Sequence, residues 1–389
     1  MADQPVRVMI HPFFFLAETW NGIDQHLLLF SRHLDPSRFA LLLLIHDSDG
    51  AQTPLLAERA AMKPVPAPYP ADAGARTRLN ALTHLLAEQR VDLLHLHSPT
   101  VGGQAVPALA ARMAGVKATL ASYHQVQPRR LSVKSRTISW LTHSLLIDGT
   151  IAISQGVRDS LVDLTGLPQR RLRVILYGCD PPEPVGQPTA LPPREPGEVR
   201  LGFFGRLSPE KGVSGLLQAL ALLAPRCPHA RALIVGDGPM RSELESTASG
   251  LDLQGRVKFL GFRSDARQIM EKVDIVVHTP VIEGFGLVIL EAMVAGRPVV
   301  INDAPGGMSA IVVDGETGLI VPSGVPAATA NALARLIEDP AARNRLGANG
   351  RKRYEQHFSA RRMTERIEAV YNGVLSGRRR TLPLPAAIR

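Results

Sequence analysis

The chain has 389 residues, more than one hydrophobic core usually supports, and 45% of them are hydrophobic, so we expect two globular domains. Its formal net charge of +9 indicates anionic partners, but only 5% of the residues are aromatic and no nucleic-acid-binding motif accompanies the basic runs, so we expect no nucleic acid partner. Cys179 and Cys227 form neither a disulfide framework nor a zinc-ligand spacing, which is typical of a reducing cytoplasm.

The first half of the sequence alternates short apolar runs with helical stretches. The expected strands are residues 6–10, 40–45, 91–95, 118–122, 150–153 and 173–175, and the expected helices are residues 23–34, 76–89, 101–113 and 156–164. This alternation predicts a parallel sheet with helices on both faces. We place this Rossmann-like domain at residues 1–180.

A proline-rich stretch at residues 181–198 cannot form a regular helix or a central strand and is expected to be a linker. The strand pattern then resumes at residues 199–204, 231–235, 257–260, 275–278, 298–301 and 318–321. A second Rossmann-like domain is therefore expected at residues 199–360. Residues 361–389 are expected to form a helix that packs back toward the first domain, followed by a basic tail. The predicted fold class is α/β, with the two sheets facing each other across a cleft.

Two glutamates bracket the segment from Glu283 to Glu291, which follows the strand at 275–278 and leads into an apolar helix. Gly284 and Gly286 allow backbone N–H groups to approach a ligand closely, and the positive end of the helix points to the same place. An anionic ligand is expected there, and the two carboxylates are suited to hold polar groups at its ends.

A second loop carries two cations after the strand at 199–204. Arg206 can bind two phosphate oxygens through its guanidinium group, and Lys211 adds a point charge, so together they are suited to a diphosphate. Solvated basic side chains are the alternative. The position of this loop after a strand, with Gly205 and Gly212 at its ends, favours the diphosphate.

Two other motifs are interpreted as turns. The run from Val235 to Pro239 lacks the third glycine of a dinucleotide fingerprint, which argues against a dehydrogenase. Asp47 and Asp49 could hold a metal ion, but an exposed turn before Gly50 is the interpretation that we favour. We expect no metal site.

The first domain offers further candidates at strand ends and helix starts. Gly22 precedes the first long helix, where an anion or a simple helix cap would fit. His95 and His97 share one face of a strand, and packing explains them better than metal binding. His124 follows the strand at 118–122 and is the better candidate for contact with a substrate, although a structural role is equally consistent with the pattern.

Together these residues resemble the GT4 family of retaining glycosyltransferases, which have the GT-B fold, from the first strand to beyond Val321. The most specific element is the pair of glutamates separated by seven residues, Glu283 and Glu291, followed by the run from Gly296 to Val300. The family usually has a second glycine where this chain has Asn21, and a glutamate where it has Ala310.

The resemblance implies a role for each candidate residue. Arg206 and Lys211 would hold the donor diphosphate, Glu291 the ribose hydroxyls, and Glu283 the transferred sugar. The amides of Gly284, Phe285, Gly286 and Leu287 would hold sugar and phosphate, His124 would face the donor sugar, and Gly22 would lie at the diphosphate. The first domain would bind the acceptor and the second the nucleotide sugar.

The expected function is transfer of a sugar from a nucleoside diphosphate sugar to a hydroxyl of a small molecule, lipid or glycan, with retention and without a metal. No cofactor is expected, and a UDP-sugar is the favoured co-substrate, although the residues themselves do not name the base or the sugar. One alternative is a nucleotide-sugar epimerase of the same fold. Another is a non-catalytic membrane-surface protein that uses the basic segment at residues 129–143, which includes Trp140.

No apolar run of transmembrane length and no leader-like start are evident in the sequence. The expected location is therefore the cytoplasm, with peripheral contact at the inner membrane face if the basic segment binds lipid.

Overall fold

The structure is a computed structural model that describes residues 4–12, 22–46, 57–70, 72–99, 101–126, 131–182 and 191–377. The chain forms two compact units, one made of Met1–Gly178 and Ala360–Arg389 and the other of Cys179–Ser359. Asn21, Asp47, Asp49 and the basic residues 129 and 130 lie outside the described residues, as does the tail from residue 378. The expectations about them stay predictions.

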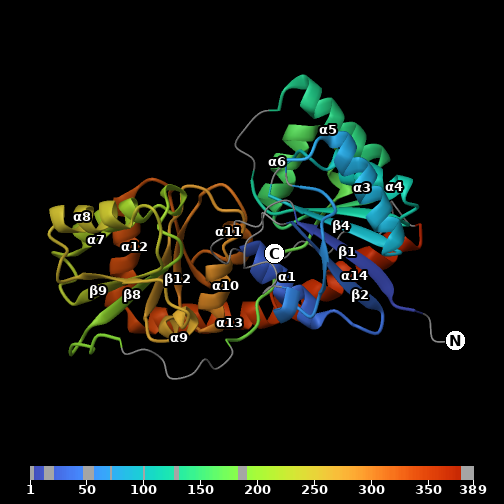
Figure 1. The fold of residues 1–389 in the computed structure, drawn as a ribbon. Coiled ribbons are helices and arrows are strands. Elements are labelled where there is room, and N and C mark those ends of the chain that lie inside the picture. Colours follow the sequence, from blue (N-terminus) through green and yellow to red (C-terminus); the bar gives the residue numbers. More distant parts are fainter. Residues whose placement is uncertain are drawn as a thin grey trace. The chain divides into compact units, whose positions relative to one another are not determined.

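The first unit contains a parallel sheet of seven strands in the order β3-β2-β1-β4-β5-β6-β7. The strands are β1 (Val6–Pro12), β2 (Phe39–Ile45), β3 (Lys63–Pro66), β4 (Leu93–Ser98), β5 (Ala118–Tyr123), β6 (Gly149–Ala152) and β7 (Leu172–Val174). The helices are α1 (Gly22–His33), α3 (Ala75–Glu88), α4 (Ala105–Met113), α5 (Val133–Leu145), α6 (Gln155–Thr165) and α14 (Ala360–Leu375), with a 3-10 turn at Gln169–Arg171. Helices α3, α4 and α5 cover one face of the sheet, and α1 and α14 cover the other (Figure 1).

The strand β3 is an element that the sequence did not predict. It contains Pro64 and Pro66, and prolines lack the N–H that a central strand must donate. Among the described strands it lies at the edge of the sheet, where it pairs with β2. An edge strand tolerates proline because one side of its backbone needs no partner strand.

The helix α14 returns to the first unit after the chain has formed the second. The Tyr371 hydroxyl hydrogen-bonds Nδ1 of His95 at 2.7 Å, and Arg38 pairs with Glu368 at 3.3 Å. Gly149 is the first residue of β6. A Cβ at this position would crowd the side chains of Leu120 and Val374, so the glycine allows α14 to approach closely. The closing helix is therefore part of the first hydrophobic core.

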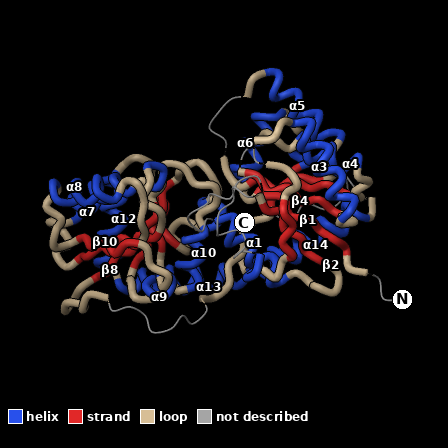
Figure 2. Tube along the Cα trace, in the orientation of Figure 1, coloured by secondary structure: helices blue, strands red, loops and turns tan. Residues whose placement is uncertain are grey.

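The second unit contains a parallel sheet of six strands in the order β10-β9-β8-β11-β12-β13. The strands are β8 (Val199–Phe204), β9 (Ala230–Val235), β10 (Val257–Gly261), β11 (Ile275–His278), β12 (Val299–Asn302) and β13 (Gly318–Val321). The helices are α7 (Val213–Leu223), α8 (Arg241–Gly250), α9 (Ala266–Met270), α10 (Leu287–Val294), α11 (Met308–Ile311), α12 (Pro326–Glu338) and α13 (Pro340–His357), with a 3-10 turn at Pro209–Lys211. Helices α7, α8 and α12 pack together on one face, and α9, α10 and α13 on the other (Figure 2).

Candidate active site

The order of the strands explains why two distant loops of the second unit meet. The first strand of this unit, β8, has β9 on one side and β11 on the other, so the chain reverses its direction of winding between β8 and β11. The carboxyl ends of these two neighbouring strands lead into the loops that carry Lys211 and Glu283. In open α/β sheets ligands bind at such a switch point.

Lys211 and Glu283, both predicted from the sequence, form an ion pair at this switch point. Nζ of Lys211 donates to Oε2 of Glu283 at 2.6 Å, and Nε2 of His278 lies 3.1 Å from the same oxygen. The backbone N–H of Gly284 donates to the other carboxylate oxygen at 3.1 Å. The side chain of Glu283 is only 15% exposed, so these partners hold the carboxylate in a largely dry place.

The surroundings keep Glu283 ionised. Burial alone would raise the pKa of this carboxyl group, but the hydrogen bond from His278 and the charge of Lys211 outweigh burial and lower the pKa to about 2. Glu283 is therefore a carboxylate at neutral pH and accepts hydrogen bonds. It is not suited to donate a proton.

Close backbone packing fixes the loop that carries Arg206 and Lys211. Gly212 has a φ of +67°, and a Cβ there would overlap the carbonyl oxygen of Thr279. On the other side, a Cβ on Gly236 would overlap the carbonyl oxygen of Gly205, and the N–H of Leu207 donates to the carbonyl of Asp237 at 2.9 Å. The glycines of the run from Val235 to Pro239 thus form a structural turn, as predicted, and this turn supports the loop that carries Arg206.

A third loop positions the backbone of Glu283. The N–H of Glu283 donates to the carbonyl of Pro305 at 3.2 Å, and Glu283 and Gly306 form an isolated parallel bridge. Gly306 has a φ of +144°, and a Cβ there would overlap the carbonyl oxygen of Glu283. Glycine is required at this position both for its backbone conformation and for the close approach.

The start of α10 and the side chain of Arg206 are two further groups of the second unit that are suited to bind an anion. Gly286, with a φ of +93°, is the N-cap of α10, so the predicted residues Gly284, Phe285, Gly286 and Leu287 form the turn into the helix. The side chain of Arg206 is exposed, and its guanidinium has no hydrogen-bond partner among the described residues. Guanidinium groups and the N-terminal ends of helices commonly bind anions in proteins.

Glu291 lies inside α10 and has a partner that the sequence analysis missed. Nε of Arg267, in α9, donates to Oε1 of Glu291 at 2.9 Å. The same guanidinium contacts Sγ of Cys179 at 3.1 Å and the carbonyl of Asp180 at 3.2 Å. No spacing in the sequence connects Arg267 with Glu291, because the contact depends on how α9 and α10 pack.

The predicted residues of the first unit lie in different surroundings. Gly22 is the exposed first residue of α1. His124 is buried and hydrogen-bonds the Tyr177 hydroxyl through Nδ1 and His97 through Nε2, the latter at 3.1 Å. His95 and His97 are also buried, and His95 hydrogen-bonds Tyr371 and Ser122, contacts that are consistent with the packing role predicted for both.

The four buried histidines His26, His95, His97 and His124 are neutral. Burial lowers the pKa of His26 and of His95 to about 3, and burial together with neighbouring rings holds the pKa of His97 and His124 well below 6.5. Within the described part of the chain, no group of three or more His, Cys, Asp or Glu side chains is placed to hold a metal ion.

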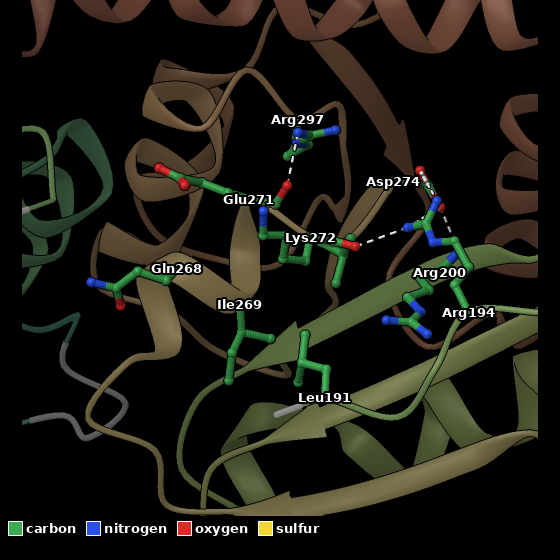
Figure 3. Close-up of a pocket in the computed structure, with 10 residues that line it drawn as sticks. Leu191, Arg194, Arg200, Gln268, Ile269, Glu271, Lys272, Asp274 and Arg297 are labelled. Atoms are coloured by element: carbon green, nitrogen blue, oxygen red, sulfur yellow. Dashed lines mark hydrogen bonds and ion pairs between the residues drawn. The ribbon is translucent and has the colours of Figure 1, made fainter. Parts of the chain in front are cut away.

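A cavity of the second unit lies away from these loops. It has a volume of about 550 Å³ and is lined by residues at the amino ends of strands, including Arg200 of β8, Asp274 before β11 and Arg297 before β12 (Figure 3). Arg194, from the proline-rich stretch, pairs there with Asp274 at 3.2 Å. Because the candidate site lies at the opposite, carboxyl ends of the strands, we assign this cavity to the packing of the proline-rich stretch.

The chain matches two family profiles and several curated proteins. Residues 20–182 match the family described as Glycosyltransferase Family 4, and residues 192–353 match Glycosyl transferases group 1. A phosphatidyl-myo-inositol mannosyltransferase of Mycobacterium leprae is 30% identical over 384 residues, which cover 93% of this chain and 96% of that protein. An alpha-D-kanosaminyltransferase of Streptomyces kanamyceticus is 32% identical over 174 residues, but this match covers 44% of this chain and only 45% of the relative.

Solved structures agree with this result. The protein HepE of Anabaena, solved in complex with UDP, has a TM-score of 0.78 over 95% of this chain and 100% of its own, at 24% identity. At this identity the similarity demonstrates a shared fold, namely two Rossmann-like units with parallel sheets. The chain belongs to glycosyltransferase family 4 and has the GT-B fold.

Proposed function

We propose that the protein transfers a sugar from a nucleoside diphosphate sugar, preferably a UDP-sugar, to a hydroxyl group of a small molecule, lipid or glycan, with retention of anomeric configuration. The observation that carries the proposal is the meeting of Lys211, Glu283 and His278 at the switch point of the second sheet. Arg206 lies on the same loop as Lys211, with an exposed side chain. HepE of Anabaena, whose fold this chain shares, has been solved with UDP and with UDP-glucose, which supports the choice of donor.

The chemistry needs stabilisation of a leaving group. When the bond between the anomeric carbon and the diphosphate oxygen breaks, the oxygen keeps the electron pair and negative charge develops on the diphosphate. Arg206, Lys211 and the amides at the start of α10 are suited to stabilise this charge. The acceptor oxygen attacks the anomeric carbon from the same face, and its proton passes to the departing oxygen.

The carboxylate of Glu283 positions the sugar in this scheme. It is ionised and its oxygens accept hydrogen bonds from Lys211, His278 and the N–H of Gly284. When the diphosphate binds, Lys211 can turn toward the phosphate oxygens, which leaves a carboxylate oxygen for a sugar hydroxyl. A metal would have no separate task, because the two cations already neutralise the diphosphate.

The proposal is tested with a panel of UDP-, GDP-, ADP- and dTDP-sugars, first in thermal-shift experiments and then in transfer assays with the donor that stabilises the fold. We expect stabilisation by one nucleotide class, and a glycoside with the anomeric configuration of the donor by NMR. Incubation of the donor alone distinguishes slow hydrolysis from epimerisation. Inversion at the anomeric carbon, or an epimer formed without acceptor, would refute the proposal.

A further inference from the structure

Exposed hydrophobic side chains of this protein concentrate on one surface of the first unit. Seven of the eleven exposed large hydrophobic side chains found among the described residues belong to two helices, so their distribution is not the scatter expected of an ordinary surface. Five of them, Val133, Ile138, Trp140, Leu141 and Leu145, lie on α5. The other two, Leu109 and Met113, lie on α4, which packs beside α5 on the same face of the sheet (Figure 1). We call this surface the α4–α5 face.

The exposed hydrophobic residues of α5 do not lie on the side of the helix that packs against the rest of the first unit. The helix has a separate buried side, where Nε2 of His143 hydrogen-bonds the Tyr123 hydroxyl at 2.7 Å and Thr142 is also buried. Its start is capped by Ser132, whose hydroxyl accepts from the N–H of Ser135. The helix is therefore well anchored, while Val133 remains 84% exposed and Leu145 66% exposed.

The sequence stretch that contains α4 and α5 carries charged side chains of one sign only. Between Asp92 and Asp148 the sequence contains no aspartate or glutamate, although the chain has 35 acidic residues. The same stretch contains Arg112, Lys117, Arg129, Arg130, Lys134 and Arg136. Lys134 lies on α5 among the exposed hydrophobic residues, and Arg112 lies on α4 beside Met113.

We propose that the α4–α5 face docks on an anionic lipid surface. Hydrophobic and basic side chains on one helical surface, without carboxylates, fit the boundary between acyl chains and negative headgroups. A tryptophan at such a boundary places its ring at the level of the headgroups. A protein partner with an apolar surface would not require that α4 and α5 both lack carboxylates. Over the described ranges, no helix has the length and apolar character that a bilayer crossing requires, so the contact is one of docking on the surface.

The proposal is tested by flotation of the full chain with vesicles of phosphatidylcholine alone or mixed with phosphatidylglycerol, at low and at high salt. We expect binding only to the mixed vesicles and weaker binding at high salt. In a Trp20→Phe background Trp140 is the single tryptophan, and its emission should shift to the blue when mixed vesicles are added. Neither readout requires a nucleotide sugar or an acceptor, so failure here is independent of failure of the proposed transfer.

Matched substitutions separate a specific face from general stickiness. Leu145→Ser with Trp140→Ser should weaken vesicle binding at least about tenfold, because both side chains would leave the acyl boundary. Lys134→Gln should weaken it roughly fivefold, as expected for loss of one basic residue near the surface. Leu222→Ser on α7, where the side chain is 57% exposed, and Lys258→Gln on β10 are the controls and should bind as wild type.

Three results would overturn the proposal. The first is absence of binding to mixed vesicles by the wild type, with no change in Trp140 emission. The second is equal loss of binding in the α5 variants and in the controls. The third is a wild-type dimer, detected by light scattering, that becomes a monomer in the Trp140→Ser, Leu145→Ser variant without any vesicle binding, because the face would then contact a second copy of the chain.

Discussion

Nζ of Lys211 lies 2.6 Å from Oε2 of Glu283, across loops that follow two neighbouring strands of one sheet. The residues are far apart in the sequence, and the contact exists because β8 and β11 are adjacent at the point where the winding of the sheet reverses. This pair connects a cation suited to phosphate with a carboxylate suited to a sugar. The predictions below follow from it and from the residues that support it.

Removal of Lys211 should affect catalysis more than folding. In Lys211→Ala we expect kcat/KM for sugar transfer to fall by about 10²- to 10³-fold, because the developing charge on the diphosphate loses one stabilising cation. The free energy of unfolding should fall by about 1–3 kcal/mol, since Glu283 keeps its contacts with His278 and Gly284 but loses the ammonium group of Lys211.

The pair formed by Arg226 and Glu338 is a matched control. It has the same length, 2.6 Å, but both side chains are about half exposed. Arg226→Ala should leave kcat/KM unchanged and the free energy of unfolding nearly unchanged, because exposed ion pairs contribute little. Equal effects of the two substitutions on kcat/KM would contradict a special role for Lys211.

Gly306 should be essential for the position of Glu283. In Gly306→Ala the new Cβ would overlap the carbonyl oxygen of Glu283, so the loop must move and carry the carboxylate with it. We expect a loss of about 2–4 kcal/mol in the free energy of unfolding and at least about a tenfold loss of kcat/KM. Urea unfolding and steady-state kinetics measure the two effects.

Substitution of Gly315 is a control that distinguishes the effect of steric overlap from the effect of backbone strain. It has a φ of +72°, and a Cβ there would meet no atom within 4 Å. Gly315→Ala should therefore cost only about 1 kcal/mol from the strained backbone and should leave kcat/KM unchanged. If Gly306→Ala behaved like Gly315→Ala, the contact with Glu283 would have no importance for catalysis.

Arg267 should position Glu291 for the ribose of the donor. In Arg267→Ala the carboxylate of Glu291 loses the guanidinium at 2.9 Å, and we expect KM for the donor to rise about tenfold with a smaller change in kcat. The wild type should prefer a UDP-sugar over its 2′-deoxy analogue, and this preference should shrink in both Arg267→Ala and Glu291→Ala. A role limited to stability would leave the preference intact.

The pH dependence of stability should differ between the two units. The buried histidines of the first unit, His26, His95, His97 and His124, are neutral when folded, because their pKa values lie well below 6.5. In the unfolded chain they bind protons near pH 6.5. The stability of this unit is therefore fully present above about pH 7.5 and falls as the pH drops below 6.5, because each of these histidines must then release a proton in order to fold.

The second unit should respond only to stronger acid. The pKa of Glu283 is lowered from 4.5 to about 2, so its contribution is present above pH 4.5 and is lost as the pH falls from there toward 2. Both tryptophans belong to the first unit by sequence, so their fluorescence in urea titrations at about pH 7.5 and about pH 5.5 follows that unit. Equal midpoints at the two pH values would contradict neutral, buried histidines.

Much of the fold follows from the sequence because the strands of both sheets are short apolar runs separated by helical stretches. The expected strands at 199–204, 275–278 and 318–321 coincide with β8, β11 and β13. Local patterns of this kind depend on neighbouring residues alone. The edge strand β3 was missed because its prolines argue against a strand, and only its place in the sheet explains why they are tolerated.

The site could be predicted only in part, for a related reason. Glu283, Lys211 and Glu291 belong to motifs that are contiguous or follow a strand directly, so their spacing is visible in the sequence. The partners His278 and Arg267 were missed, although His278 ends the strand that leads to Glu283 and could have been found from this position. Arg267 could not, because its contact with Glu291 arises from the packing of two helices.

The central claim is that Arg206 and Lys211 bind the diphosphate of a nucleotide sugar, and calorimetric titration with UDP and with uridine tests it most directly. We predict that the wild type binds UDP and that the Arg206→Ala, Lys211→Ala double variant, if folded, binds UDP at least about 100-fold more weakly, since two charge-assisted contacts are lost. The weak binding of uridine should be the same in both proteins. Equal affinity of the wild type and the double variant for UDP would contradict the account.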